Sequence, residues 1–163
     1  LPQAVGRLAK IKNIVGIKEA SGSVQQISEV IACCGPDFTV LSGDDALSLP
    51  VMALGGKGVI SVTANVLPHK VAQLCSLALN NRMEEARAIH FELLKINNDM
   101  FIETNPIPVK TALGLMGKIS PELRLPLSPM SPDNLERLKS TLREYSLISL
   151  ELGNLKKQEA CFG

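Results

Sequence analysis

The segment that most constrains the fold is a short apolar run from Ile14 to Lys18, which has the composition of a buried β-strand. Because side chains alternate along a strand, Lys18 shares a face with Gly16, and Ile17 lies on the opposite face. Both faces are apolar up to the lysine. This pattern is typical of a parallel strand that is covered on both sides, so it predicts an α/β fold.

Two more strands are expected at 38–41 and 58–63, and helical spacing of apolar residues predicts helices at 23–34 and 46–54. The alternation of strands and helices predicts a parallel βαβαβ unit with right-handed crossovers. The polar residues at the three strand ends should then lie at one edge of the sheet. They are Lys18, Ser42 to Asp45, Thr63 and Asn65.

The rest of the chain is predicted to be mainly helical, with a first helix at 1–10 and no further strands after residue 67. The expected helices are 68–79, 83–101, 109–116 and 132–147, with a break at Asn105 to Pro108 and an extended proline-rich connector at 121–132. We divide the chain into a partial barrel (1–67), a helical region (68–148) and a frayed tail (149–163). The chain begins with Leu1 rather than Met, which suggests a piece of a longer protein.

Composition argues against several classes of protein. A net charge of +1, with acidic and basic residues interspersed, gives no electrostatic surface for nucleic acid or membrane. No apolar run of about 18 residues and no signal peptide is present, so we expect a soluble, cytoplasmic protein. The cysteines form no CxxC pair and are expected to be free thiols, and His69 and His90 lack ligand-like neighbours, so we predict no metal and no cofactor.

Lys18 has two interpretations from its position alone. A lysine at a strand end can extend to solvent and have no chemical role. Alternatively, apolar neighbours can disfavour the ammonium ion and free the amine to attack a carbonyl group, forming a Schiff base. The edge where Lys18 lies is the edge at which α/β proteins bind ligands.

Several motifs, in order and at matching spacing over residues 1 to about 148, resemble the C-terminal part of the dihydrodipicolinate synthase family of pyruvate-dependent Schiff-base enzymes. The matching segments are Gly16 to Gly22, Leu41 to Asp45, Gly58 to Asn65, Asn105 to Lys110 and Arg124 to Leu127. Each motif alone would be weak evidence, but together they are specific.

The resemblance implies the last three strands of a (β/α)8 TIM barrel followed by a C-terminal helical domain. It implies that Lys18 forms a Schiff base with pyruvate, and that the resulting enamine attacks aspartate semialdehyde in lysine biosynthesis. In this family the backbone carbonyl at the position of Ile60 lines the pyruvate site, and the glycine at the position of Gly43 lies close by.

The resemblance leaves out much of the catalytic machinery of the family. The proton-relay tyrosine, the threonines that hold the pyruvate carboxylate, the entrance arginine and the lysine-feedback site belong to the missing strands. Tyr145, the single tyrosine, falls in the final helix and is not assigned the relay role. We therefore expect the chain to be inactive by itself, and oligomeric or aggregation-prone because its sheet has an open side.

Two alternatives stay open at this point. The related N-acetylneuraminate lyases share the lysine strand, although the Gly-Asp-Asp and Asn-Pro-Ile-Pro motifs favour the synthase. The chain could also be a non-catalytic truncated relative. For the full-length protein the resemblance implies a homotetramer.

Overall fold

The computed structural model describes residues 1–149, so the predicted frayed tail lies outside the described residues except for Ser149. The chain packs as two compact units, residues 1–97 and residues from 98 onward. Each unit is described separately below. The predicted domain division at residue 67 stays a prediction.

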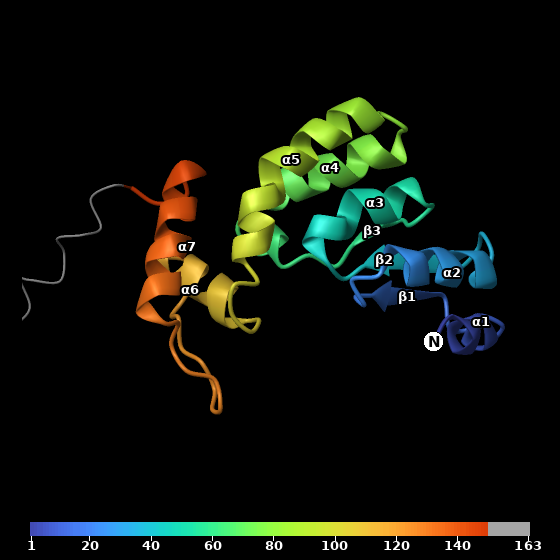
Figure 1. The fold of residues 1–163 in the computed structure, drawn as a ribbon, viewed down its shortest axis with the longest axis horizontal. Coiled ribbons are helices and arrows are strands. Elements are labelled where there is room, and N and C mark those ends of the chain that lie inside the picture. The colour runs from blue at the N-terminus through green and yellow to red at the C-terminus, as the bar shows by residue number, and fades with distance from the viewer. Residues whose placement is uncertain (150–163) are drawn as a thin grey trace, which may run out of the picture. The chain divides into compact units, whose positions relative to one another are not determined.

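A three-stranded parallel sheet forms the centre of the first unit, in the order β1-β2-β3 (Figure 1). The strands are β1 (Gly16–Glu19), β2 (Thr39–Ser42) and β3 (Gly58–Val59). Between them lie α2 (Val24–Cys34), then the short 3-10 helix η1 (Asp45–Leu47) and α3 (Ser48–Ala53). The predicted βαβαβ order and parallel pairing are confirmed.

The third strand is much shorter than predicted, because β3 ends at Val59 instead of Thr63. Beyond it the backbone turns into the 3-10 helix η2 (Thr63–Asn65). The carboxylate of Asp45 accepts hydrogen bonds from the N–H groups of Val62 and Thr63, at 2.8 and 3.2 Å. These bonds take the place of sheet pairing, so an apolar β-branched sequence here forms a turn.

One face of the sheet is covered by helices and the other is open in this chain. Val30 of α2 packs with Phe38 and Val40, and Ile17 of β1 packs against the same cluster. Residues of α1 (Pro2–Leu8) and the turn after it join this core. On the opposite face Lys18 is exposed. The prediction that this strand is covered on both sides is therefore wrong for this chain, because the residue at the carboxyl end of that face is open to solvent.

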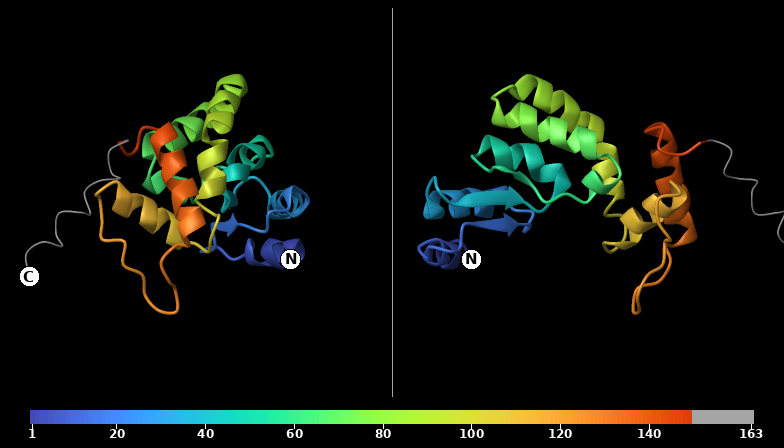
Figure 2. Two further views of the ribbon diagram at one scale, coloured as in Figure 1. Left: turned by 60° about the vertical axis from the view of Figure 1, so that its left-hand side comes forward. Right: turned by 180° about the vertical axis from the view of Figure 1, so that it is seen from behind.

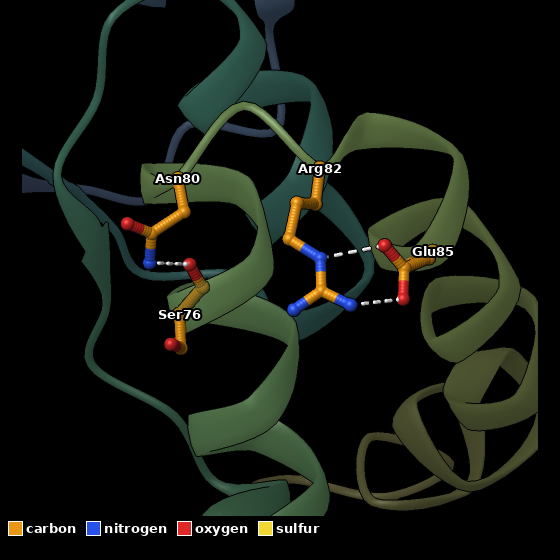
Figure 3. Close-up of polar contacts among 4 residues, drawn as sticks. All are labelled: Ser76, Asn80, Arg82 and Glu85. Atoms are coloured by element: carbon orange, nitrogen blue, oxygen red, sulfur yellow. Dashed lines mark hydrogen bonds and ion pairs between the residues drawn. The ribbon is translucent and has the colours of Figure 1, made fainter.

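Two antiparallel helices, α4 (Pro68–Leu79) and α5 (Met83–Asp99), lie side by side after the sheet (Figures 1 and 2). The α4–α5 turn is closed by local hydrogen bonds, drawn in Figure 3. The side-chain amide of Asn80 donates to the carbonyl of Ser76 at 2.8 Å, and Arg82 pairs with Glu85 in the first turn of α5. The hydrogen bond and charge of Glu85 raise the pKa of Arg82 above its usual value. The turn therefore favours antiparallel packing of the two helices.

The second unit contains α6 (Ile107–Leu115) and α7 (Pro132–Glu144), joined by the predicted connector without regular structure. The buried carboxylate of Asp99 accepts hydrogen bonds from Arg137 at 2.8 Å and from the buried hydroxyl of Thr141. Glu103 accepts hydrogen bonds from Asn134 and Ser131, which lower the pKa of its carboxyl group. These contacts attach α7 to the segment that follows α5.

Candidate active site

Lys18 is the third residue of β1, and its side chain runs directly past Gly43 at the end of β2. Lys18 is paired in register with Leu41, and the N–H of Gly43 donates to the carbonyl of Glu19 at 2.7 Å. A Cβ atom added at Gly43 would lie 2.7 Å from Cε of Lys18 and 2.6 Å from Cβ of Ala20. These distances are too short for two carbon atoms, so the lysine chain can take this course only past a glycine.

The surroundings of the amine differ from those that a buried nucleophile requires. Lys18 is exposed. β1 is also one of the two edge strands of the sheet. The desolvation that would favour a neutral amine is therefore not supplied by the part of the chain that the structure describes.

A buried glutamate next to the lysine shapes the loop that follows β1. Glu19 is only 7% exposed, and its carboxylate accepts hydrogen bonds from the backbone and hydroxyl of Ser21 and from the side-chain amide of Gln26, at 3.0–3.1 Å. The hydroxyl of Ser23 caps α2 by accepting the N–H of Gln26 at 3.2 Å. Ser23 therefore caps the helix, whereas Ser21 bonds to Glu19 within the loop. This network fixes the end of β1, and with it the backbone of Lys18.

Ile60 lies one strand further along the same edge of the sheet. Its N–H donates to the carbonyl of Ser42 at 2.8 Å, and its side chain is 47% exposed. Among residues 1–149, no group donates a hydrogen bond to the Ile60 carbonyl. The structure thus brings Lys18 and Gly43 into contact and ties Ile60 to the end of β2.

Asp45 was grouped with the polar edge residues in the sequence, but its contacts could not be predicted. It is 3% exposed, and its carboxylate accepts hydrogen bonds from the hydroxyl of Ser61 as well as from two backbone N–H groups. These partners are 16 to 18 residues away, a spacing that carries no periodic signal.

The other two polar residues at this edge, Thr63 and Asn65, make no hydrogen bond to each other among the described residues. The hydroxyl of Thr63 is buried and has no hydrogen-bond partner among the described residues, and the side-chain amide of Asn65 donates to the carbonyl of Val62 at 2.9 Å. In the described part of the chain, no cluster of three or more His, Cys, Asp or Glu side chains is placed to hold a metal ion. Cys33, Cys34 and Cys75 are free thiols, while Cys161 lies outside the described residues.

The fold and the site together define a class of protein. An open parallel sheet with a lysine at the carboxyl end of one strand, next to a required glycine, is the arrangement of α/β proteins that bind ligands at this edge. None of the helices in residues 1–149 has the length and apolar character needed to cross a membrane.

The chain belongs to the dihydrodipicolinate synthetase family, whose model matches residues 1–145. It is 60% identical over 148 residues to the 4-hydroxy-tetrahydrodipicolinate synthase of Geotalea daltonii, and 55% identical over 150 residues to that of Persephonella marina. Each match covers 91% of this chain and 51% of the relative. The chain therefore spans about half the length of the curated relatives it matches, and it is homologous to a lyase of diaminopimelate and lysine biosynthesis.

Solved structures of the same family match the fold. Dihydrodipicolinate synthase from Thermotoga maritima superposes with a TM-score of 0.88 at 42% identity, over 91% of this chain and 52% of that one. The enzyme from Aquifex aeolicus gives a TM-score of 0.85 at 46% identity, over 88% and 49%. The predicted family is confirmed, and the open sheet matches part of the TIM barrel of these enzymes.

Proposed function

We propose that this chain is the C-terminal part of a 4-hydroxy-tetrahydrodipicolinate synthase and carries its Schiff-base lysine, Lys18. The sheet would be the last three strands of the barrel, and residues after 67 its helical addition. The observation that supports this most directly is the passage of the Lys18 side chain across Gly43, at the ligand-binding edge of a chain 55–60% identical to such synthases.

The proposed chemistry begins with attack of the Lys18 amine on the keto carbon of pyruvate, followed by loss of water to give an imine. The imine acidifies the methyl group, which loses a proton to form an enamine. The enamine carbon then attacks the aldehyde carbon of aspartate semialdehyde, whose oxygen takes up a proton, and the lysine is again held as an imine. The amino group that came from aspartate semialdehyde attacks the imine carbon, which closes the ring and displaces the Lys18 amine. A relative from Acinetobacter baumannii, 38% identical and with a TM-score of 0.87, has been crystallised in complex with pyruvate, which supports this substrate.

In this proposal Gly43 and Ile60 are substrate-site residues. Gly43 leaves space beside the amine, and the carbonyl of Ile60, which has no donor among the described residues, would be available as a hydrogen-bond acceptor. The proton relay and the groups that hold the pyruvate carboxylate would come from the other half of the barrel. That half would also cover the face of Lys18 and supply the desolvation that this chain lacks. A homotetramer is expected for the full-length protein.

The experiment uses this chain joined behind the N-terminal half of the Geotalea daltonii relative, here called the completed protein. Pyruvate and borohydride are added, and the reduced adduct is located by peptide mass mapping. We expect the label on Lys18, because reduction converts only an imine into a stable amine. Lys12 is a matched control, since it is an exposed lysine at the other end of the same segment.

The variant Lys18→Ala should lose the pyruvate label, and Lys12→Ala should keep it. Label spread over surface lysines, with Lys18 unmodified, would contradict the proposal. Running this chain alone in parallel shows how much of the reactivity depends on the missing half.

A further inference from the structure

We propose that Asp45 is a positioning residue that holds the carbonyl group of Ile60 in place for pyruvate. This inference rests on the proposed function, in which Ile60 lines the pyruvate site. In this inference Asp45 does not contact pyruvate. It acts through its hydrogen bonds to the turn of residues 61–63.

The carboxylate of Asp45 has three donors, and all of them come from the turn directly after Ile60. They are the hydroxyl of Ser61 and the N–H groups of Val62 and Thr63. No basic side chain within residues 1–149 forms a salt bridge with Asp45. Burial of a carboxylate without hydrogen-bond partners destabilises the folded state, and Asp45 is only 3% exposed. The three hydrogen bonds offset this cost. The turn and the carboxylate therefore stabilise each other.

The peptide of Ile60 is fixed on both sides by this arrangement. Before it, the Ile60 N–H is bonded to Ser42 at 2.8 Å, and after it Ser61 is bonded to Asp45. The hydroxyl of Ser61 also accepts the N–H of Ala64 at 2.7 Å, which closes the turn. With its neighbours fixed and no donor of its own, the Ile60 carbonyl is a preorganised acceptor.

The same loop supports the lysine. Residues 42–48 carry both Gly43, which borders Lys18, and Asp45. The hydroxyl of Ser42 donates to the carbonyl of Asp44 at 2.7 Å, and the hydroxyl of Ser48 donates to the carbonyl of Asp45 at 2.8 Å. One rigid loop thus sets the distance between the amine and the Ile60 carbonyl.

The test measures how the rate of borohydride trapping at Lys18 depends on pyruvate concentration in the completed protein. Asp45→Ala removes the acceptor for all three donors. We expect its half-saturating pyruvate concentration to rise about 10- to 100-fold, since misplacement of a binding group by about 1 Å has effects of this size. The KM for aspartate semialdehyde should change by less than about threefold, because that substrate is not held by this turn.

Three further variants separate positioning from general stability. Asp45→Asn keeps an oxygen for the two backbone N–H groups and a donor for Ser61, so it should restore pyruvate dependence to within about fivefold of the original protein. Ser61→Ala removes one of the three bonds. Its half-saturating pyruvate concentration should lie between those of Asp45→Asn and Asp45→Ala. Asp44→Asn removes a neighbouring charge but keeps the acceptor that caps Ala46, and should behave like the original protein.

A folded Asp45→Ala variant with unchanged pyruvate dependence would overturn the inference. If that variant does not fold, unchanged pyruvate dependence in Ser61→Ala overturns it instead. Equal losses in Asp44→Asn and Asp45→Asn would also overturn it, because charge rather than the held turn would then be responsible. Failure of the proposed function is distinguishable, since it appears as trapping that does not require Lys18 in the protein with an intact Asp45.

Discussion

At the scale of single residues, the candidate site depends on Gly43, because no side chain fits at this position. Gly43 has ordinary backbone geometry, so its importance does not come from conformational freedom. It comes from the close approach of Lys18 and Ala20, both within 2.7 Å of where a Cβ atom would lie. A methyl group there would push the lysine away from its course along the edge of the sheet.

Gly43→Ala in the completed protein should therefore lower the rate of pyruvate trapping about 100-fold, since the amine would be displaced by about 1 Å or more. The double variant Gly43→Ala with Ala20→Gly separates the two contacts. This double variant no longer has the clash with Cβ of Ala20, so its thermal stability should be higher than that of Gly43→Ala. Its rate of pyruvate trapping should stay low, because the clash with Cε of Lys18 is still present. Full recovery of trapping in the double variant would show that Lys18 does not need this space.

At the scale of elements, the order of strands and helices could be predicted because apolar spacing and turn residues are local signals. Helix α2 ends at Cys34 as expected, and Ser23, the first residue of the predicted helix, is its N-cap. The end of β3 could not be predicted, because a distant carboxylate, Asp45, competes for its backbone N–H groups. Helix α6 begins at Ile107, two residues before the predicted start, since a proline is tolerated in a first helical turn.

Only part of the candidate site could be predicted, because some of its contacts join residues that are far apart in the sequence. The strand-end position of Lys18 left two interpretations of this residue open, and the roles expected for Lys18, Gly43 and Ile60 are those that the family resemblance implies. The contact between Lys18 and Gly43 depends on strand register, which the sequence pattern leaves open. In the proposed function Lys18 would be covered by strands that are not among the described residues, so this chain's sequence carries no signal for that contact.

A second element-scale prediction concerns α7. Asp99 is fully buried and bonds Thr141, which is also fully buried, together with Arg137. Asp99→Ala leaves these donors unpaired, so the free energy of local unfolding of α7 should fall by about 2–3 kcal/mol. Hydrogen exchange of the α7 amides, measured in the completed protein, should accelerate about 30- to 150-fold.

Glu136→Ala is the matched control, because Glu136 lies on the same helix and forms an exposed pair with Lys139. Loss of such a pair should change local stability by less than about 0.5 kcal/mol. Equal exchange rates in the two variants would mean that Asp99 does not hold α7.

At the scale of the whole molecule, the proposed function gives this chain the Schiff-base lysine without the surroundings that the chemistry needs. Its sheet ends at β1, where Lys18 is exposed. The relatives are about twice as long, and in the proposed function their other half supplies the proton relay and the carboxylate-binding groups. Each missing catalytic group of this kind is worth on the order of 10² to 10⁴ in rate.

The most direct test of the central claim is turnover of pyruvate and aspartate semialdehyde by three proteins: this chain alone, the completed protein, and the completed protein with Lys18→Ala. We predict turnover only in the completed protein with Lys18 intact, because this half supplies the amine and the other half supplies positioning and proton transfer. Turnover by the chain alone above that of its own Lys18→Ala variant, or undiminished turnover by the completed Lys18→Ala protein, would contradict the account.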